Sequence, residues 1–157
     1  MSRMHLGAAL AVAALALAGT ASADTTEKSH GHDKTIRLVE ANKELQPTFV
    51  DTGKPGPSVG DIVVARDDVL REDGSPAGTF RQVCTLVDLV GGPFTSTFEC
   101  TGSIALKDGT ITMEGPFVPA APESVAAITG GTGAYKTARG EIVVRAKADQ
   151  IIVKLAR

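Results

Sequence analysis

The sequence predicts an all-β fold, a barrel or a sandwich, for the region that follows an N-terminal export signal. From Thr35 to the end of the chain, short runs rich in Val, Ile and Thr recur at roughly ten residues per strand. Clusters of Gly, Pro and Asp separate these runs. Tryptophan is absent and aromatic residues make up 4% of the chain. We therefore expect a core of Val, Ile, Leu and Ala with a few Phe, which favours strands over a large aromatic-caged site.

The first 23 residues have the features of a secretory signal peptide. A polar start precedes an apolar run from Leu6 to Gly19, and Ala21-Ser22-Ala23 has the small-x-small pattern that signal peptidase cleaves. The run is too short for a membrane span, which needs about 20 apolar residues. We predict a signal peptide over residues 1–23, a mature chain that starts at Asp24, and a secreted, extracellular protein without stable membrane insertion after cleavage.

Residues 24–34 are polar and are expected to form a flexible start of the mature chain. They include Ser29-His30-Gly31-His32-Asp33, whose histidines and aspartate could supply metal ligands, although a metal site also needs fixed geometry and supporting groups. A flexible terminus is the favoured interpretation, so we predict no metal and no cofactor. The chain has no histidine after His32. This excludes a histidine-containing triad and a conventional zinc enzyme site from the domain, residues 35–157.

Eight candidate strands account for the domain. They are, in order, Thr35–Ala41, Gly60–Leu70, Gly78–Leu89, Phe94–Leu106, Thr110–Phe117, Val125–Thr129, Glu141–Ala148 and Gln150–Leu155. Turn residues fit between them at Asp73-Gly74-Ser75-Pro76, Gly91-Gly92-Pro93, Asp108-Gly109 and Gly130-Gly131-Thr132-Gly133. Asp108-Gly109 is the strongest hairpin signal. Ile62-Val63-Val64 is apolar on both faces, as expected where a strand lines a cavity and also packs outward.

Neither a nucleotide nor a nucleic acid is an expected ligand. The glycine-rich stretch from Ala127 to Glu141 looks at first like a nucleotide-binding loop, but such a loop opens a helix in a βαβ unit of roughly 30 residues or more. Only strand-like residues follow Gly140, and Lys136 stands where the third glycine of G-x-G-x-x-G belongs. The favoured interpretation is a tight turn between strands. No basic patch with interleaved aromatics is present, which argues against nucleic acid.

The two cysteines are placed symmetrically about a turn. Cys84 and Cys100 are equally distant from Gly92, so a symmetric hairpin brings them opposite each other. The same register pairs Phe80 with Ile104 and Leu86 with Phe98. The secreted compartment permits a disulfide. A disulfide, a pair of buried thiols and a thiol that lines a ligand cavity all remain open, and a structural role is favoured.

Four segments follow one another in the order that a known family shows. They are Gly60-Asp61-Ile62-Val63 through Val69-Leu70, Arg81-Gln82-Val83-Cys84-Thr85-Leu86-Val87, Gly109-Thr110-Ile111-Thr112-Met113-Glu114-Gly115-Pro116-Phe117, and Ala127-Ile128-Thr129-Gly130-Gly131-Thr132-Gly133 with Tyr135 and Gly140. Together they resemble the allene oxide cyclase and dirigent-protein barrel superfamily. The resemblance implies an eight-stranded antiparallel β-barrel of lipocalin-like architecture, commonly assembled as a homotrimer. Its mostly apolar lumen suits an apolar small-molecule ligand.

The resemblance also implies a site. Plant allene oxide cyclases carry a Glu-x-Asn motif, to which Glu40-Ala41-Asn42 is similar; there the glutamate is thought to stabilise a developing cation, and the asparagine and a proline to position a water. Pro47 is the nearest proline, and a second asparagine of the family corresponds to Asp68, which cannot donate a hydrogen bond unless it is protonated. Cys84 corresponds to the family's steric cysteine. The candidate catalytic residues are therefore Glu40 and Asn42, and the candidate lumen residues are Pro47, Asp68, Phe80, Cys84, Phe98 and Cys100.

Two kinds of function follow from these observations. The leading hypothesis is a barrel that binds an apolar small molecule and promotes its cyclisation or isomerisation through shape, desolvation and the carboxylate of Glu40. The alternative is a lipophilic-ligand carrier or a dirigent-like or structural barrel, in which Glu40-Ala41-Asn42 is only a strand end that leads into a polar loop. An open apolar lumen with one buried carboxylate favours the first, and a filled polar lumen the second.

Overall fold

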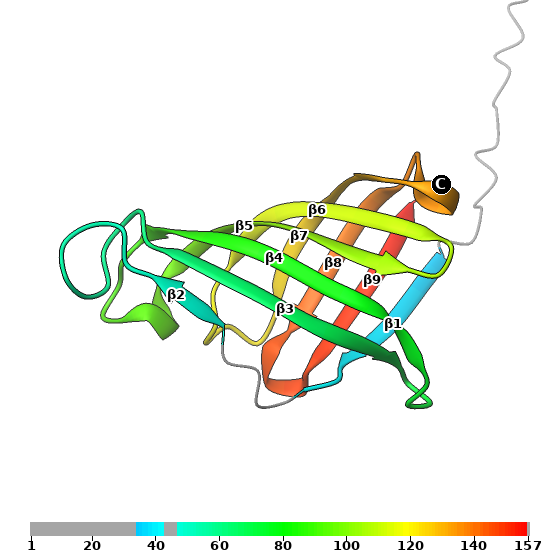
Figure 1. The fold of residues 1–157 in the computed structure, drawn as a ribbon, viewed down its shortest axis with the longest axis horizontal. Coiled ribbons are helices and arrows are strands. Elements are labelled where there is room, and N and C mark those ends of the chain that lie inside the picture. The colour runs from blue at the N-terminus through cyan, green and yellow to red at the C-terminus, as the bar shows by residue number, and fades with distance from the viewer. Residues whose placement is uncertain (1–33, 43–46, 157) are drawn as a thin grey trace, which may run out of the picture. The chain divides into compact units, whose positions relative to one another are not determined.

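The computed structural model describes residues 34–42 and 47–156, which form strands joined by short connections (Figure 1). The elements are β1 (Lys34–Glu40), β2 (Thr48–Val50), β3 (Ile62–Arg71), β4 (Pro76–Asp88), β5 (Thr97–Leu106), β6 (Gly109–Phe117), β7 (Ser124–Gly131), β8 (Arg139–Arg145) and β9 (Gln150–Ala156), with the 3-10 helices η1 (Pro93–Thr95), η2 (Gly133–Tyr135) and η3 (Ala146–Ala148). In the described part, no helix has the length and apolar character to cross a membrane. The predicted signal peptide and the His30 to Asp33 motif lie outside the described residues.

The strands close into an antiparallel barrel. Each strand from β3 to β9 pairs with its successor in the chain, β9 pairs with β1, and β1 pairs with β3 to complete the ring. The short strand β2 lies on the other end of β3 and adds no position to the ring. The barrel therefore has eight strands, as predicted. Sequential pairing of this kind is the up-and-down arrangement, which leaves no open edge in the closed ring.

The predicted strands agree with the observed ones to within two residues at each end, except at three places. Strand β2 has only three residues and carries no periodic signal of its own. Strand β5 begins at Thr97 because Pro93 starts the helix η1. Strand β8 ends at Arg145, where η3 follows and Asp149 adopts a left-handed conformation with φ of 53°. Aspartate is one of the residues that tolerate this conformation, so the chain makes a tight bend here, and the strand ends three residues before its predicted end.

The end of the barrel near the glycine-rich stretch is packed. Tyr135 of η2 is 8% exposed and joins the main core. Gly133 has φ of 58°, and a Cβ atom there would collide with the carbonyl of Asp108 in the β5–β6 hairpin. The stretch is therefore a connection between β7 and β8 whose glycine permits close approach. The core of this half is Leu38, Val69, Phe80, Ile104, Ile111, Met113, Ala126, Ile128, Tyr135, Ile142, Ile151 and Val153.

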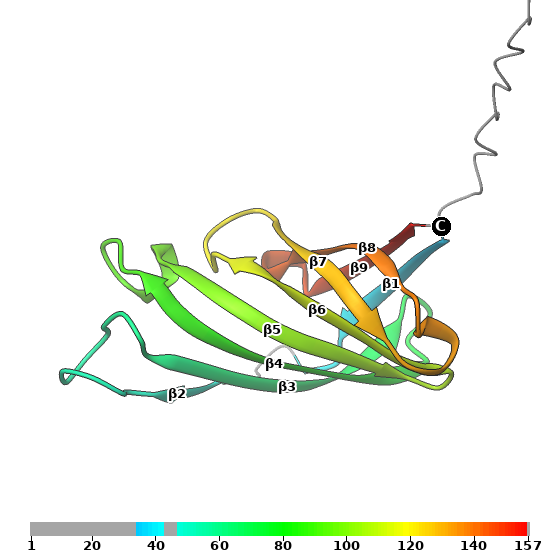
Figure 2. The same cartoon turned by 90° about the horizontal axis from the view of Figure 1, so that it is seen from above.

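The opposite end carries the longer connections, β2–β3 and β4–β5 (Figures 1 and 2). Asp61 holds the first of them in place, since its fully buried carboxylate accepts hydrogen bonds from the backbone N–H groups of Thr52 (3.0 Å) and Ser58 (2.6 Å). These bonds lower the pKa of Asp61. Gly60 precedes it with φ of 101°, and its N–H donates to the carbonyl of Leu86 in β4 (2.8 Å). The Gly60-Asp61 pair thus anchors the loop to the barrel.

Candidate functional site

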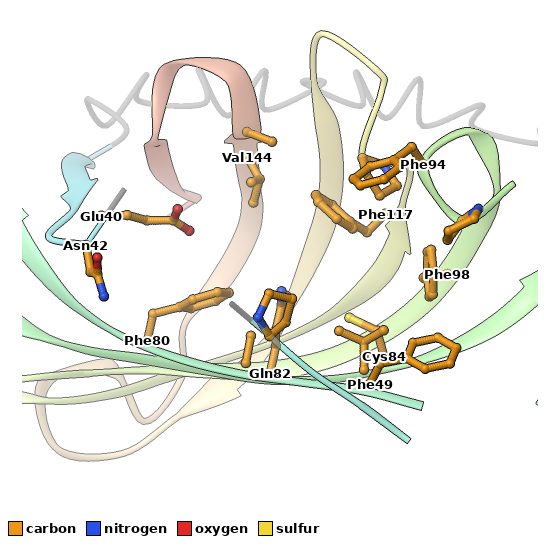
Figure 3. Close-up of a pocket in the computed structure, with 16 residues that line it drawn as sticks. Glu40, Asn42, Phe49, Phe80, Gln82, Cys84, Phe94, Phe98, Phe117 and Val144 are labelled. Carbon is orange, nitrogen blue, oxygen red and sulfur yellow. The ribbon is translucent and has the colours of Figure 1, made fainter. Parts of the chain in front are cut away.

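A cavity of about 370 Å³ occupies the end of the barrel that carries the long connections (Figure 3). Ligand pockets typically have volumes of about 300 to 1,000 Å³. Its lining residues are Glu40, Asn42, Pro47, Phe49, Val63, Ala65, Phe80, Gln82, Cys84, Pro93, Phe94, Phe98, Phe117, Pro119, Val144 and Ala146. All five phenylalanines of the chain are among them. Phe80 and Phe98 were expected in the lumen, whereas Phe49, Phe94 and Phe117 were not, so the few aromatic residues gather in one place more than their scarcity suggested.

The pleat of the strands decides which side chains reach the cavity. Phe80, Gln82 and Cys84 alternate along β4, so all three point to the inner face. Val63 and Ala65 do the same on β3. Among the described residues no hydrogen bond engages the amide of Gln82, which therefore has its donor and acceptor available to a ligand.

Glu40 supplies the negative charge of the cavity wall. It is the last residue of β1, is partly buried, and points its carboxylate into the cavity (Figure 3). Burial raises the pKa of Glu40, and the neighbouring carboxylates of Asp67 and Asp149 raise it further. Among the described residues, no hydrogen bond or ion pair engages the Glu40 carboxylate. The group is thus poised to exchange a proton with a ligand or to face a positive charge.

Asp68 does not belong to the lumen, which corrects the assignment made from the family motif. Its side chain is exposed on the outer face, where it forms an ion pair with Arg66 (3.2 Å) and accepts a hydrogen bond from Thr79 (3.2 Å). The inward residue is its neighbour Asp67, which is 4% exposed. Successive strand residues point to opposite faces, so a one-residue difference moves the carboxylate from one side of the wall to the other.

Asp67 is a site residue that the sequence interpretation missed. Its carboxylate accepts hydrogen bonds from the backbone N–H groups of Asn42 (3.2 Å) and Asp68 (2.8 Å). It therefore fixes the backbone that follows β1 and places a second acidic group beside Glu40. The alternation of Val64, Arg66 and Asp68, two of them charged, was the signal that marked the outer face of β3.

Glu40 and Asn42 lie together at one end of the cavity, and Cys84 lies at the other end with Phe98 (Figure 3). Phe80 and Gln82 lie between the two ends (Figure 3). The structure thus brings Glu40, Asn42, Pro47, Phe80, Cys84 and Phe98 to a single cavity. It separates the proposed catalytic pair from the cysteine by the length of that cavity.

The two cysteines are bonded to each other next to the cavity. Cys84 is directly opposite Cys100 in the β4–β5 register, and a disulfide joins them. Cys84 lines the cavity, whereas Cys100, beside it on the adjacent strand, is not among the lining residues. Both are buried in a small cluster with Leu86 and Phe98, which are opposite each other in the same hairpin.

The fold and the cavity define the class of protein: an antiparallel barrel with a small-molecule site in its lumen. The model of the allene oxide cyclase barrel-like domain matches residues 36–152, and the chain belongs to this family. No curated protein matches the sequence.

Solved structures show the same architecture. A pyocyanin demethylase is 27% identical, with a TM-score of 0.66, over 78% of this chain and all of that chain (100%). The Diels-Alderase AbmU from Streptomyces koyangensis is 10% identical, with a TM-score of 0.54, over 81% of this chain and 71% of the other. A pterocarpan synthase dirigent protein is 19% identical, with a TM-score of 0.51, over 78% of this chain and 83% of the other. The last two show the fold alone.

Proposed function

We propose that this barrel binds a flat, largely apolar small molecule in its cavity and catalyses a cyclisation or isomerisation, with Glu40 as the group that moves a proton or faces a developing cation. One observation carries the proposal: all five phenylalanines of the chain line a single cavity whose charged lining residue is Glu40, a glutamate with a raised pKa. Aromatic walls favour a ligand with a flat face.

The proposed cyclisation or isomerisation involves no net oxidation or reduction. In an isomerisation, the Glu40 carboxyl group donates a proton at one ligand atom, and the carboxylate recovers a proton from another, so mass and electrons are conserved. A carboxyl group whose pKa is raised toward neutrality serves both steps better than an ordinary one. The phenylalanines contact the ligand and hold it in one orientation, which lowers the barrier further.

A second candidate reaction is hydrolytic removal of a methyl group from a flat aromatic molecule, in which water takes the methyl group as methanol and its remaining proton stays on the ring system or is released. It is favoured by the 27% identity to a pyocyanin demethylase that aligns over its full length. Pyocyanin is a three-ring aromatic molecule, a shape that suits an aromatic-lined cavity. The third candidate is a carrier that binds such a molecule and leaves it unchanged.

One experiment separates these functions. Native mass spectrometry of protein purified from its own host identifies the copurified ligand, and this ligand and pyocyanin are then incubated with the wild type, Glu40→Gln and Glu99→Gln. Glu99 is exposed on the outer face of β5, so Glu99→Gln removes the same charge away from the cavity. We expect a product of unchanged mass. We also expect turnover to fall by roughly 100-fold or more in Glu40→Gln, with binding retained, and to persist in Glu99→Gln.

Other outcomes select the other functions. A product that lacks a methyl group identifies the demethylase. Binding without any product identifies the carrier. Equal turnover by the wild type and Glu40→Gln contradicts the assigned role of the carboxylate.

We also infer that the protein acts outside the cytoplasm. The signal-like residues 1–23 and the disulfide between Cys84 and Cys100 support this, because disulfides persist in oxidising compartments. N-terminal sequencing of the protein from culture supernatant is expected to begin at Asp24, whereas an intact Met1 would contradict the export prediction.

A further inference from the structure

Among the described residues, the charge that lines the cavity is negative. Glu40 is the charged residue of the lining, and Asp67 lies buried beside it. No lysine, arginine or histidine contributes to the lining as far as the described residues go. A ligand carboxylate would find no positive partner among the described lining residues and would face Glu40 instead.

The described lysine and arginine side chains lie outside the cavity lining. Arg66 lies on the outer face of β3, paired with Asp68. Arg145, next to the lining residue Val144, is held by Glu123 at 2.7 Å. Lys34 lies over the ring of Tyr135, 6.0 Å from its centroid, at the packed end of the barrel. None of these three is a lining residue, so none compensates the carboxylates inside the barrel.

The aromatic lining also favours a positively charged ligand. The face of a phenyl ring carries partial negative charge and attracts a cation held over it. The phenylalanine side chains come from both sides of the cavity, since Phe80 and Phe98 belong to adjacent strands whereas Phe94 belongs to η1 (Figure 3). A flat positively charged ring system could therefore stack on aromatic faces while its charge remains close to Glu40.

We propose that the cavity selects flat aromatic cations and weak bases over anions, with the positive or N–H-bearing end of the ligand against Glu40 and the ring among the phenylalanines. The inference rests on the proposed function and narrows its substrate class. It gives Gln82, midway along the cavity, a positioning role: its amide can bond a polar ring substituent between the acidic end and the aromatic end.

The proposal has a consequence for proton uptake. The groups that face Glu40 are the carboxylates of Asp67, from β3, and Asp149, which follows η3, and both disfavour its ionised form. A bound cation favours the ionised form. Binding of a permanent cation therefore releases a proton from Glu40, and affinity for that cation rises as pH increases through the pKa of the free protein.

The test uses three probes with the same three-ring skeleton: 10-methylacridinium, acridine and acridine-9-carboxylate. Their dissociation constants are measured by fluorescence with the wild type, Glu40→Gln and Glu99→Gln at pH 7.5. We expect the wild type to bind the cation more tightly than the anion by on the order of tenfold or more. Glu40→Gln is expected to lose most of this preference, and Glu99→Gln to keep it. Circular dichroism shows whether each variant is folded.

The outcomes are distinguishable. Binding of all three probes with equal affinity, or an unchanged preference in folded Glu40→Gln, overturns the charge selection and leaves the proposed binding function intact. Tighter binding of the anion also overturns the charge selection. Failure of the folded wild type to bind any of the three probes contradicts the proposed aromatic-ligand function itself.

Discussion

Reduction of the disulfide between Cys84 and Cys100 tests how much of the barrel's stability depends on a cross-link next to the cavity. The chain has two cysteines, so a reductant acts on this bond alone. Reduction removes no side-chain atoms, and both sulfurs remain in the cluster with Leu86 and Phe98. The main expected effect is therefore on the unfolded chain, which gains the freedom of the loop that the bond had closed.

The size of the effect follows from the loop. The two cysteines are 16 residues apart. The loop-closure relation, about 2.1 cal/mol/K plus 1.5R times the logarithm of the loop length, gives roughly 3 kcal/mol at 25 °C for such a loop. Natural domains have unfolding free energies of about 5–15 kcal/mol. Reduction should therefore remove a substantial part of the stability and leave a folded barrel only if the rest of the core is strong.

The assay is urea unfolding of the oxidised and the fully reduced protein, followed by circular dichroism. Alkylation and mass spectrometry count the free thiols in each sample. We expect the free energy of unfolding to fall by about 3 kcal/mol on reduction. A loss of less than about 1 kcal/mol, with both thiols alkylated, would refute the argument, since it would mean that the bond does not restrict the unfolded chain.

Three further changes have defined outcomes. Glu40→Gln should stabilise the barrel at pH values above the ordinary pKa of a glutamate. Burial raises the pKa of Glu40 in the folded protein, so the wild type loses stability as pH rises from the ordinary pKa through the raised one. The gain in stability, measured by thermal unfolding, should vanish near pH 4. Gly133→Ala should lower the unfolding free energy by at least about 1 kcal/mol, because φ there is 58° and a methyl group would also meet a carbonyl; an unchanged urea midpoint would contradict this. Asp61→Asn should speed proteolysis within residues 51–61 at pH 7. Hydrogen bonds from Thr52 and Ser58 lower the pKa of Asp61, so the wild-type carboxylate stabilises this loop until the pH falls through that lowered pKa. Equal cleavage rates for variant and wild type at pH 7 would show that the carboxylate does not hold the loop.

Much of the barrel could be predicted because its strands are separated by Gly, Pro and Asp, which favour turns over strands. The β4–β5 register followed from symmetry about Gly92 and places Cys84 opposite Cys100. The turn itself is not symmetric about Gly92, because Asp88 is opposite Thr97, but the register shift between Leu86 and Asp88 restores the symmetry for the cysteine pair. Without this bulge, every partner beyond it would have been displaced by one residue.

The cavity was harder to predict because its members come from distant elements. Phe49 lies on a three-residue strand, Phe94 on a 3-10 helix and Phe117 at the end of β6, and nothing local in the sequence joins them. The error at Asp68 has a different cause. A motif fixes a position in a family, but the phase of the pleat fixes the face, and on β3 that phase makes Asp67 the inward residue.

The pairing of the first and last strands has a practical consequence. Lys34 at the start of β1 is opposite Leu155 near the end of β9, so both ends of the described barrel meet beside Tyr135, at the packed end. The cavity lies at the opposite end, among Glu40, Phe94 and their neighbours. A short linker could join the two ends without crossing the cavity mouth, so the barrel is suited to circular permutation. For the same reason, it can be immobilised on a sensor surface through either terminus with its binding site facing the solution.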